Sequence, residues 1–144
     1  MKFGIDINNN EIFSFVSEKL KDKENFVVDL RSNKNMSYGK ALLKKVLIAN
    51  ITNIDIYFEV NFKEENNSIE IFYNSYNSSK IKAEKIKEKL SEKFHNANCS
   101  KDENLYLLKN INAEVIYLRV PVIYILDFEE KILEEMIGVL SGSE

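Results

Sequence analysis

The feature that most constrains the fold of this chain is an apolar run at residues 53–62, with the sequence NIDIYFEVNF. Its aromatic and β-branched residues favour extended backbone, and the run is shorter than an ordinary globular helix. We therefore predict a central strand. A second run at 68–73 follows the polar segment 63–67, and we expect it to form a hairpin with the first run or a neighbouring strand in the same sheet.

Strand-like and helix-like patterns alternate along the rest of the chain. Short β-rich runs indicate strands, and apolar residues at intervals of three and four indicate amphipathic helices. In the second helix, Leu42, Val46 and Ala49 form one apolar stripe, and Leu43 and Leu47 widen it. We predict strands at 2–7, 26–30 and 115–125, a short strand or turn at 105–108, helices at 11–23, 38–49 and 80–94, and a final helix capped by Asp127.

This order of elements predicts an α/β fold. The expected architecture is a three-layer αβα arrangement, in which helices cover both faces of a central, mostly parallel, twisted sheet. Ligands of such folds bind at the carboxyl ends of the strands. With 144 residues, of which 44% are apolar and 30% charged, the chain is expected to form a single domain over residues 1–144.

Charge and cysteine content exclude several classes of function. The formal net charge is -3 and the pI is about 5.4, so a nucleic-acid partner is not expected. No apolar run approaches the roughly 20 residues of a membrane span. Residues 1–10 lack the basic start and apolar core of an export signal, which makes the cytoplasm the default expectation. The single cysteine, Cys99, cannot form an internal disulfide and is expected to be an inert thiol in a loop.

Several local strings, taken in order, point to one family. Arg31 follows the second strand, and residues 57–62 read Tyr-Phe-Glu-Val-Asn-Phe. These strings resemble the strand-ending Thr-Arg and the Ser-Ile-His-x-Asn-Ala strand of the zinc-dependent N-acetylmuramoyl-L-alanine amidases of the autolysin and phage-endolysin type. Segments 49–50, 69–73, 79–90 and 105–110 resemble further strings of that family. The resemblance covers nearly the whole chain and implies an amidase-like fold.

The residues that such amidases use for catalysis are replaced in this chain. By the resemblance, Asn9 stands at the first zinc histidine, Glu59 at the strand histidine, and Arg119 at the catalytic glutamate, while Glu11 is the nearest candidate for the acidic ligand. A two-histidine, one-carboxylate zinc site needs two imidazoles, and the chain has one histidine, His95. We therefore expect no cofactor, although the family uses zinc. His95 is expected to be an exposed residue at a helix end.

The replaced residues are candidates for a remnant binding groove. Glu59 and Arg119 are expected to sit at the ends of neighbouring strands, where an ion pair between them would fill the vacated metal site. Two alternatives remain for Arg119: it extends to solvent, or its planar fork holds the carboxylate of a peptide stem. The candidate groove residues are Asp6, Asn9, Glu11, Arg31, Glu59, Asn61 and Arg119.

These expectations define three functional hypotheses. The first is a catalytically degenerate amidase-like domain that binds a cell-wall peptide fragment or a protein partner such as an active amidase. The second is an active peptidoglycan amidase in which Asp6, Glu11 and Glu59 hold a divergent metal, of a harder kind than zinc. The third is an α/β module whose likeness to the amidases is architectural only.

Overall fold

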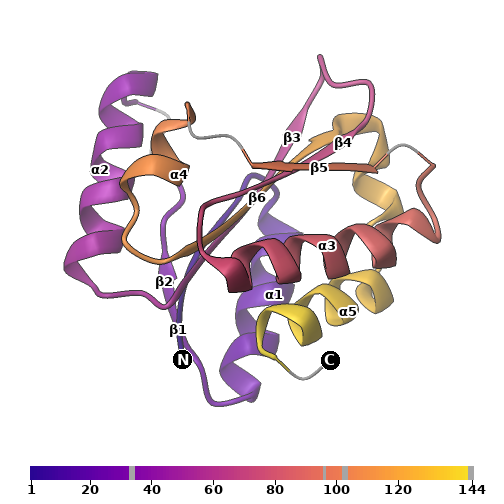
Figure 1. Cartoon of the computed structure of the whole chain (residues 1–144), viewed down its shortest axis with the longest axis horizontal. Coiled ribbons are helices and arrows are strands. Elements are labelled where there is room, and N and C mark those ends of the chain that lie inside the picture. Colours follow the sequence, from indigo (N-terminus) through magenta and orange to yellow (C-terminus); the bar gives the residue numbers. More distant parts are fainter. Residues whose placement is uncertain (33–34, 96, 102–103, 143–144) are drawn as a thin grey trace.

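The computed structural model of the chain describes residues 1–32, 35–95, 97–101 and 104–142. Strands and helices alternate along these residues, as the sequence pattern predicts (Figure 1). The strands are β1 (Lys2–Ile7), β2 (Phe26–Asp29), β3 (Ile56–Lys63), β4 (Ile69–Tyr73), β5 (Ala97–Lys101) and β6 (Glu114–Pro121). The helices are α1 (Asn10–Asp22), α2 (Tyr38–Ile51), α3 (Asn77–Ser91), α4 (Tyr106–Asn110), the 3-10 helix η1 (Val122–Asp127) and α5 (Glu130–Leu140).

The six strands form one sheet in the order β2-β1-β3-β6-β4-β5. β1 is parallel to β2 and β3, and β3 is parallel to β6. β4 runs antiparallel to β6 and parallel to β5. The predicted α/β class with a mostly parallel sheet is confirmed. The expected pairing of the two runs that became β3 and β4 is wrong, because the apolar strand β6 lies between them, buried on both faces as central strands are.

Helices cover both faces of the sheet. Figure 1 shows α2 and α4 on one side and α1, α3 and α5 on the other. Side chains alternate between the two faces along β3: Ile56, Phe58 and Val60 join the core under α1, α3 and α5, whereas Tyr57 joins the core under α2 and α4. Glu59 therefore points to the α2 side. In the part of the chain that the structure describes, no helix is long and apolar enough to cross a membrane.

Several element boundaries differ from the sequence prediction. The strand expected at 115–125 ends at Pro121, which lacks the N–H that a ladder needs, and η1 follows. The last helix begins at Glu130 with Glu129 as its N-cap, so the predicted Asp127 cap is wrong. Residues 105–108, predicted as a short strand or turn, are the N-cap and first residues of the short helix α4. The third helix begins at Asn77, three residues earlier than predicted.

The structure also contains one strand that sequence patterning did not predict. β5 extends from Ala97 to Lys101 at the edge of the sheet and pairs with β4 alone. Its few apolar residues give only a weak period-two signal. Cys99 is thus half-buried in a strand and not in a loop, and burial raises the pKa of its thiol.

α2 turns the predicted apolar stripe to the sheet, but the two leucines expected to widen that stripe point outward. Val46 and Ala49 are buried as expected, but Leu43 and Leu47 are 58% and 56% exposed. The charged Lys45 is buried instead, with 9% of its side chain exposed. A lysine on the inner side of a helix needs a partner there.

Candidate functional site

A pocket of about 580 Å³ lies at the carboxyl ends of β1 and β3, on the face of the sheet that α2 covers. This is the edge at which α/β folds bind ligands. Polar side chains from β1, α2, β3 and β6 converge there. Among those that line the pocket are Asp6, Asn8, Lys45, Glu59, Asn61 and Tyr117.

The floor of the pocket is a buried charge cluster centred on Lys45. Its Nζ atom lies 2.5 Å from Oδ2 of Asp6 and 3.4 Å from Oε1 of Glu59. The two carboxylates reach the same ammonium because Asp6 and Glu59 are directly opposite in the parallel β1–β3 ladder. The hydroxyl of Tyr57, which is fully buried, also donates a hydrogen bond to Oε1 of Glu59. One ammonium therefore faces two carboxyl groups in a dry environment.

Burial and this charge imbalance shift the pKa values of the cluster. Burial raises the pKa of Glu59 to about 7 against the opposing effect of Lys45, and it also raises the pKa of Asp6. Burial disfavours the ammonium, but the carboxylates of Glu59 and Asp6 hold the pKa of Lys45 above its ordinary value. The pKa of Tyr57 is raised by burial and by Glu59. The cluster thus keeps its ammonium charged and takes up a further proton near neutral pH.

Two asparagines at the end of β1 stabilise the fold around the pocket. The Oδ1 atom of Asn8 accepts a hydrogen bond from the Phe62 N–H at 2.8 Å, and its Nδ2 donates to the Phe62 carbonyl at 3.0 Å. Asn9 is the N-cap of α1, where its Oδ1 accepts from the N–H of Ile12 at 3.0 Å. Asn9 therefore caps the first turn of α1 at the position where the family resemblance places a zinc histidine.

At the β2 side of the pocket, all three guanidinium nitrogens of Arg31 donate hydrogen bonds. Its Nε and Nη2 atoms donate to the two carboxylate oxygens of Asp29 at 3.0 and 2.8 Å, and its Nη1 donates to Oδ1 of Asn10 at 3.2 Å. The guanidinium also lies 3.7 Å from the ring centroid of Phe13. The hydrogen bond with Arg31 lowers the pKa of Asp29. Arg31 thus ties the end of β2 to the start of α1.

The expected ion pair between Glu59 and Arg119 does not form. In the β3–β6 register Glu59 lies opposite Tyr117, and Arg119 lies opposite Asn61. Lys45, which comes from α2, pairs with Glu59 instead. The Nε of Arg119 donates to the hydroxyl of Tyr117 at 3.2 Å, so this arginine is not left free in solvent either.

Five of the seven groove residues predicted from the sequence line the pocket: Asp6, Asn9, Arg31, Glu59 and Asn61. Arg119 adjoins the pocket through Tyr117, and Glu11 is exposed on α1. The most important residue that the sequence reasoning missed is Lys45. The sequence did contain a sign of its burial. Lys45 lies four residues from both Ala41 and Ala49, so helical spacing places it on the same buried side of α2. That these residues bind a ligand stays a prediction.

The chain has the same fold as the catalytic domains of N-acetylmuramoyl-L-alanine amidases. It superposes on the catalytic domain of the CD27L endolysin, which targets Clostridia difficile, with a TM-score of 0.81 and 13% identity over 99% of this chain and 97% of that one. For the CwlV amidase of Bacillus (Paenibacillus) polymyxa var. colistinus the TM-score is 0.71, with 13% identity over 99% and 98%. For the CwlD amidase of Clostridioides difficile, solved in complex with the GerS lipoprotein, it is 0.67, with 15% identity over 96% and 93%.

At these identities the likeness defines the fold alone. Comparison of the sequence with protein-family models and with curated proteins finds no match. The predicted resemblance to the amidase fold is therefore confirmed by three-dimensional structure and not by sequence similarity. The activity has to be argued from the residues at the site.

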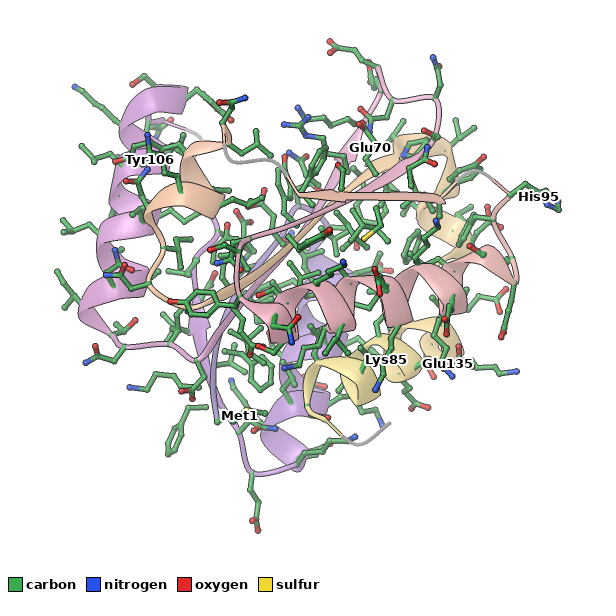
Figure 2. The ribbon with its side chains drawn as sticks, in the orientation of Figure 1. Met1, Glu70, Lys85, His95, Tyr106 and Glu135 are labelled. Carbon is green, nitrogen blue, oxygen red and sulfur yellow. The ribbon has the colours of Figure 1, made fainter. Side chains whose placement is uncertain are left out.

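The residues at the site do not fit the zinc ion that the resemblance implies. Asn9 is engaged as a helix cap, Glu59 is paired with Lys45, and the ammonium would repel a divalent cation between the two carboxylates. His95 is exposed beyond the end of α3, and Figure 2 shows it at the periphery of the molecule. Within the described residues, no group of three or more His, Cys, Asp and Glu side chains is placed to hold a metal. The divergent site of Asp6, Glu11 and Glu59 is not assembled either.

Proposed function

We propose that this chain is a non-catalytic, metal-independent domain of the amidase fold that binds a cell-wall peptide fragment in the pocket. The observation that carries the proposal is the ammonium of Lys45, which contacts both Asp6 and Glu59. Amide hydrolysis by metal-activated water needs a Lewis acid and a base that accepts the proton from water. A lysine ammonium cannot act as that Lewis acid, and the guanidinium of Arg119 cannot act as that base.

The pocket has the properties of a binding site for a small polar ligand. Its volume of about 580 Å³ lies within the range of ordinary ligand pockets. The amide of Asn61 and the hydroxyls of Tyr38 and Tyr117 offer hydrogen bonds to peptide groups, while Leu42 and Leu107 offer apolar contact to a small side chain. This combination suits a short peptide that carries an alanine.

The test combines metal analysis with ligand binding. The purified chain is equilibrated with zinc, freed of unbound ion and analysed for metal, and its binding of N-acetylmuramoyl-L-alanine is measured by calorimetry. We expect less than one tenth of an equivalent of zinc, no release of L-alanine, and saturable binding. Lys45→Met should alter this binding, while Lys44→Met is the matched control, because Lys44 is the adjacent lysine and is exposed on α2.

Two results would overturn the proposal. About one tightly held zinc ion per chain together with release of L-alanine would establish an active amidase. Absence of any binding at millimolar N-acetylmuramoyl-L-alanine would remove the cell-wall peptide as the ligand.

A second candidate function is binding of a protein partner, such as an active amidase. The outer side of α2 favours it, because Leu43, Leu47 and Ile51 are spaced by four residues and are 58%, 56% and 68% exposed. Among the similar structures, the CwlD amidase is in complex with the GerS lipoprotein, so another protein with this fold assembles with a partner. The test is sedimentation of the chain mixed with a purified active amidase. A complex that Leu47→Lys disrupts supports this function, and two independent species at micromolar concentration contradict it.

A further inference from the structure

The two arginines of the chain are in opposite situations. Every guanidinium nitrogen of Arg31 donates to an acceptor, either on Asp29 or on Asn10. Arg119 uses only its Nε, which donates to the hydroxyl of Tyr117 at 3.2 Å. Among the described residues, no carboxylate lies within 4.0 Å of Arg119, and its two Nη groups have no acceptor. The four N–H bonds that form a carboxylate-binding fork are therefore available on Arg119.

Arg119 is nevertheless held in place by aromatic rings. Its guanidinium carbon lies 5.0 Å from the ring centroid of Phe72 and 5.3 Å from that of Tyr117. Cation–π contact and the bond to the Tyr117 hydroxyl fix the orientation of the group before any ligand arrives. A fork that is already ordered loses less entropy on binding than one that moves freely.

The position of Arg119 connects it to the pocket. Tyr117, which accepts its hydrogen bond, lines the pocket together with Tyr38, and the Nδ2 of Asn61 donates to the same Tyr117 hydroxyl at 3.3 Å. The other nearby cation, Lys45, already faces two carboxylates. Of these two cations, Arg119 is the one whose charge has no carboxylate within ion-pair distance among the described residues.

Glu70 is the nearby carboxylate that would compete with a ligand for the guanidinium of Arg119. It lies on β4, directly opposite Arg119 in the antiparallel ladder, and its charge helps to raise the pKa of Arg119. Its Oε1, however, accepts from Nδ2 of Asn66 at 3.1 Å, and its carboxylate stays beyond ion-pair distance of the guanidinium. Glu70 therefore lowers the local potential that an incoming anion experiences without occupying the fork.

We propose that Arg119, oriented by Tyr117 and Phe72, is a carboxylate-binding subsite of the pocket, so that the ligand carries a free carboxylate. This inference rests on the proposed binding function and specifies its ligand class. It accounts for an arginine beside a pocket whose floor lysine already pairs with two carboxylates. Arg119 binds and positions the ligand and takes no part in a reaction.

The experiment compares N-acetylmuramoyl-L-alanine as the free acid with its C-terminal amide, by calorimetry at pH 7.5. The native chain should bind the acid about tenfold more tightly, as expected for charge-assisted hydrogen bonds. Arg119→Gln should abolish this preference, and Arg119→Lys should retain part of it. Glu70→Gln should strengthen acid binding by removal of the competing charge. Lys131→Gln, which removes a positive charge from the exposed side of α5, is the control, and its preference for the acid should be unchanged.

The outcomes separate this inference from the proposed function. Equal affinity for acid and amide would overturn the carboxylate subsite and leave peptide binding standing. If neither compound binds, the peptide proposal fails, and the subsite is judged by NMR titration with N-acetyl-L-alanine and its amide. A shift of the Arg119 side-chain resonances with the acid alone supports the subsite, and no shift overturns it.

Discussion

Replacement of Lys45 by methionine removes the charge at the centre of the pocket floor while it keeps a long, unbranched side chain. With an effective dielectric constant of about 20, Coulomb's law gives roughly 7 kcal/mol of attraction for the 2.5 Å contact with Asp6 and roughly 5 kcal/mol for the 3.4 Å contact with Glu59. Withdrawal of the ions from water cancels several kcal/mol per ion. We therefore expect Lys45→Met to lower the free energy of unfolding by about 3–5 kcal/mol, the usual cost of breaking a buried pair.

The expected loss depends on pH in a defined direction. Lys45 lowers the pKa of both Asp6 and Glu59, so in its absence the two buried carboxyls stay protonated to higher pH. A carboxyl with a raised pKa in the folded state destabilises that state as pH rises, since the unfolded chain releases the proton more readily. The loss should be larger at pH 8 than at pH 5.

Urea unfolding of the native and variant chains at both pH values measures this effect. Lys44→Met, the exposed neighbour, should change stability by no more than about 0.5 kcal/mol. The double variant Lys45→Met/Glu59→Gln removes one of the stranded charges and should regain part of the loss, which keeps the test informative if the single variant does not fold. A loss below about 1 kcal/mol at pH 8, or a double variant less stable than the single one, would refute the buried charge cluster.

Burial raises the pKa of Glu59 from 4.5 to about 7, so the folded chain binds more protons between these values and its stability falls as pH rises through them. At about 1.4 kcal/mol per pKa unit, the free energy of unfolding should fall by up to about 3 kcal/mol over this pH range. Urea unfolding of Glu59→Gln at several pH values should show a weaker pH dependence than the native chain. The buried Oγ of Ser17 has no hydrogen-bond partner among the described residues, so Ser17→Ala should leave the Tm unchanged or raise it, and a fall of several degrees speaks against this. Val46→Ala should cost about 1–3 kcal/mol and Leu47→Ala less than about 1 kcal/mol in thermal unfolding, and equal losses would contradict the orientation of α2.

The sequence predicted those features that depend on neighbours along the chain. The period of apolar residues located β1, β3 and α1, and the alternation of strands and helices gave the α/β class with a mostly parallel sheet. The polar residues after residue 7 marked where β1 ends, whereas the predicted end of β6 was four residues too late. The resemblance to the amidase fold came from the order of local strings, which the superposition on the CD27L domain confirms for the fold.

The tertiary structure decided which segments meet. The hydrogen-bonding edge of a strand does not encode its partner, so the insertion of β6 between β3 and β4 could not be found from their patterns. The partner of Glu59 was likewise undetermined, because an ion pair joins side chains that only the packing of α2 on the sheet brings together.

Sequence by itself thus determined most of the elements, the fold class and the presence of a single histidine, one too few for a two-histidine zinc site, since each follows from residue type and local spacing. Tertiary structure alone placed Lys45 between Asp6 and Glu59 and left the fork of Arg119 without an acceptor among the described residues. The physical reason is that burial and charge pairing are properties of three-dimensional neighbourhoods. A lysine on a helix is ordinary in sequence, and it becomes the centre of the site only when the helix packs on the ends of two strands.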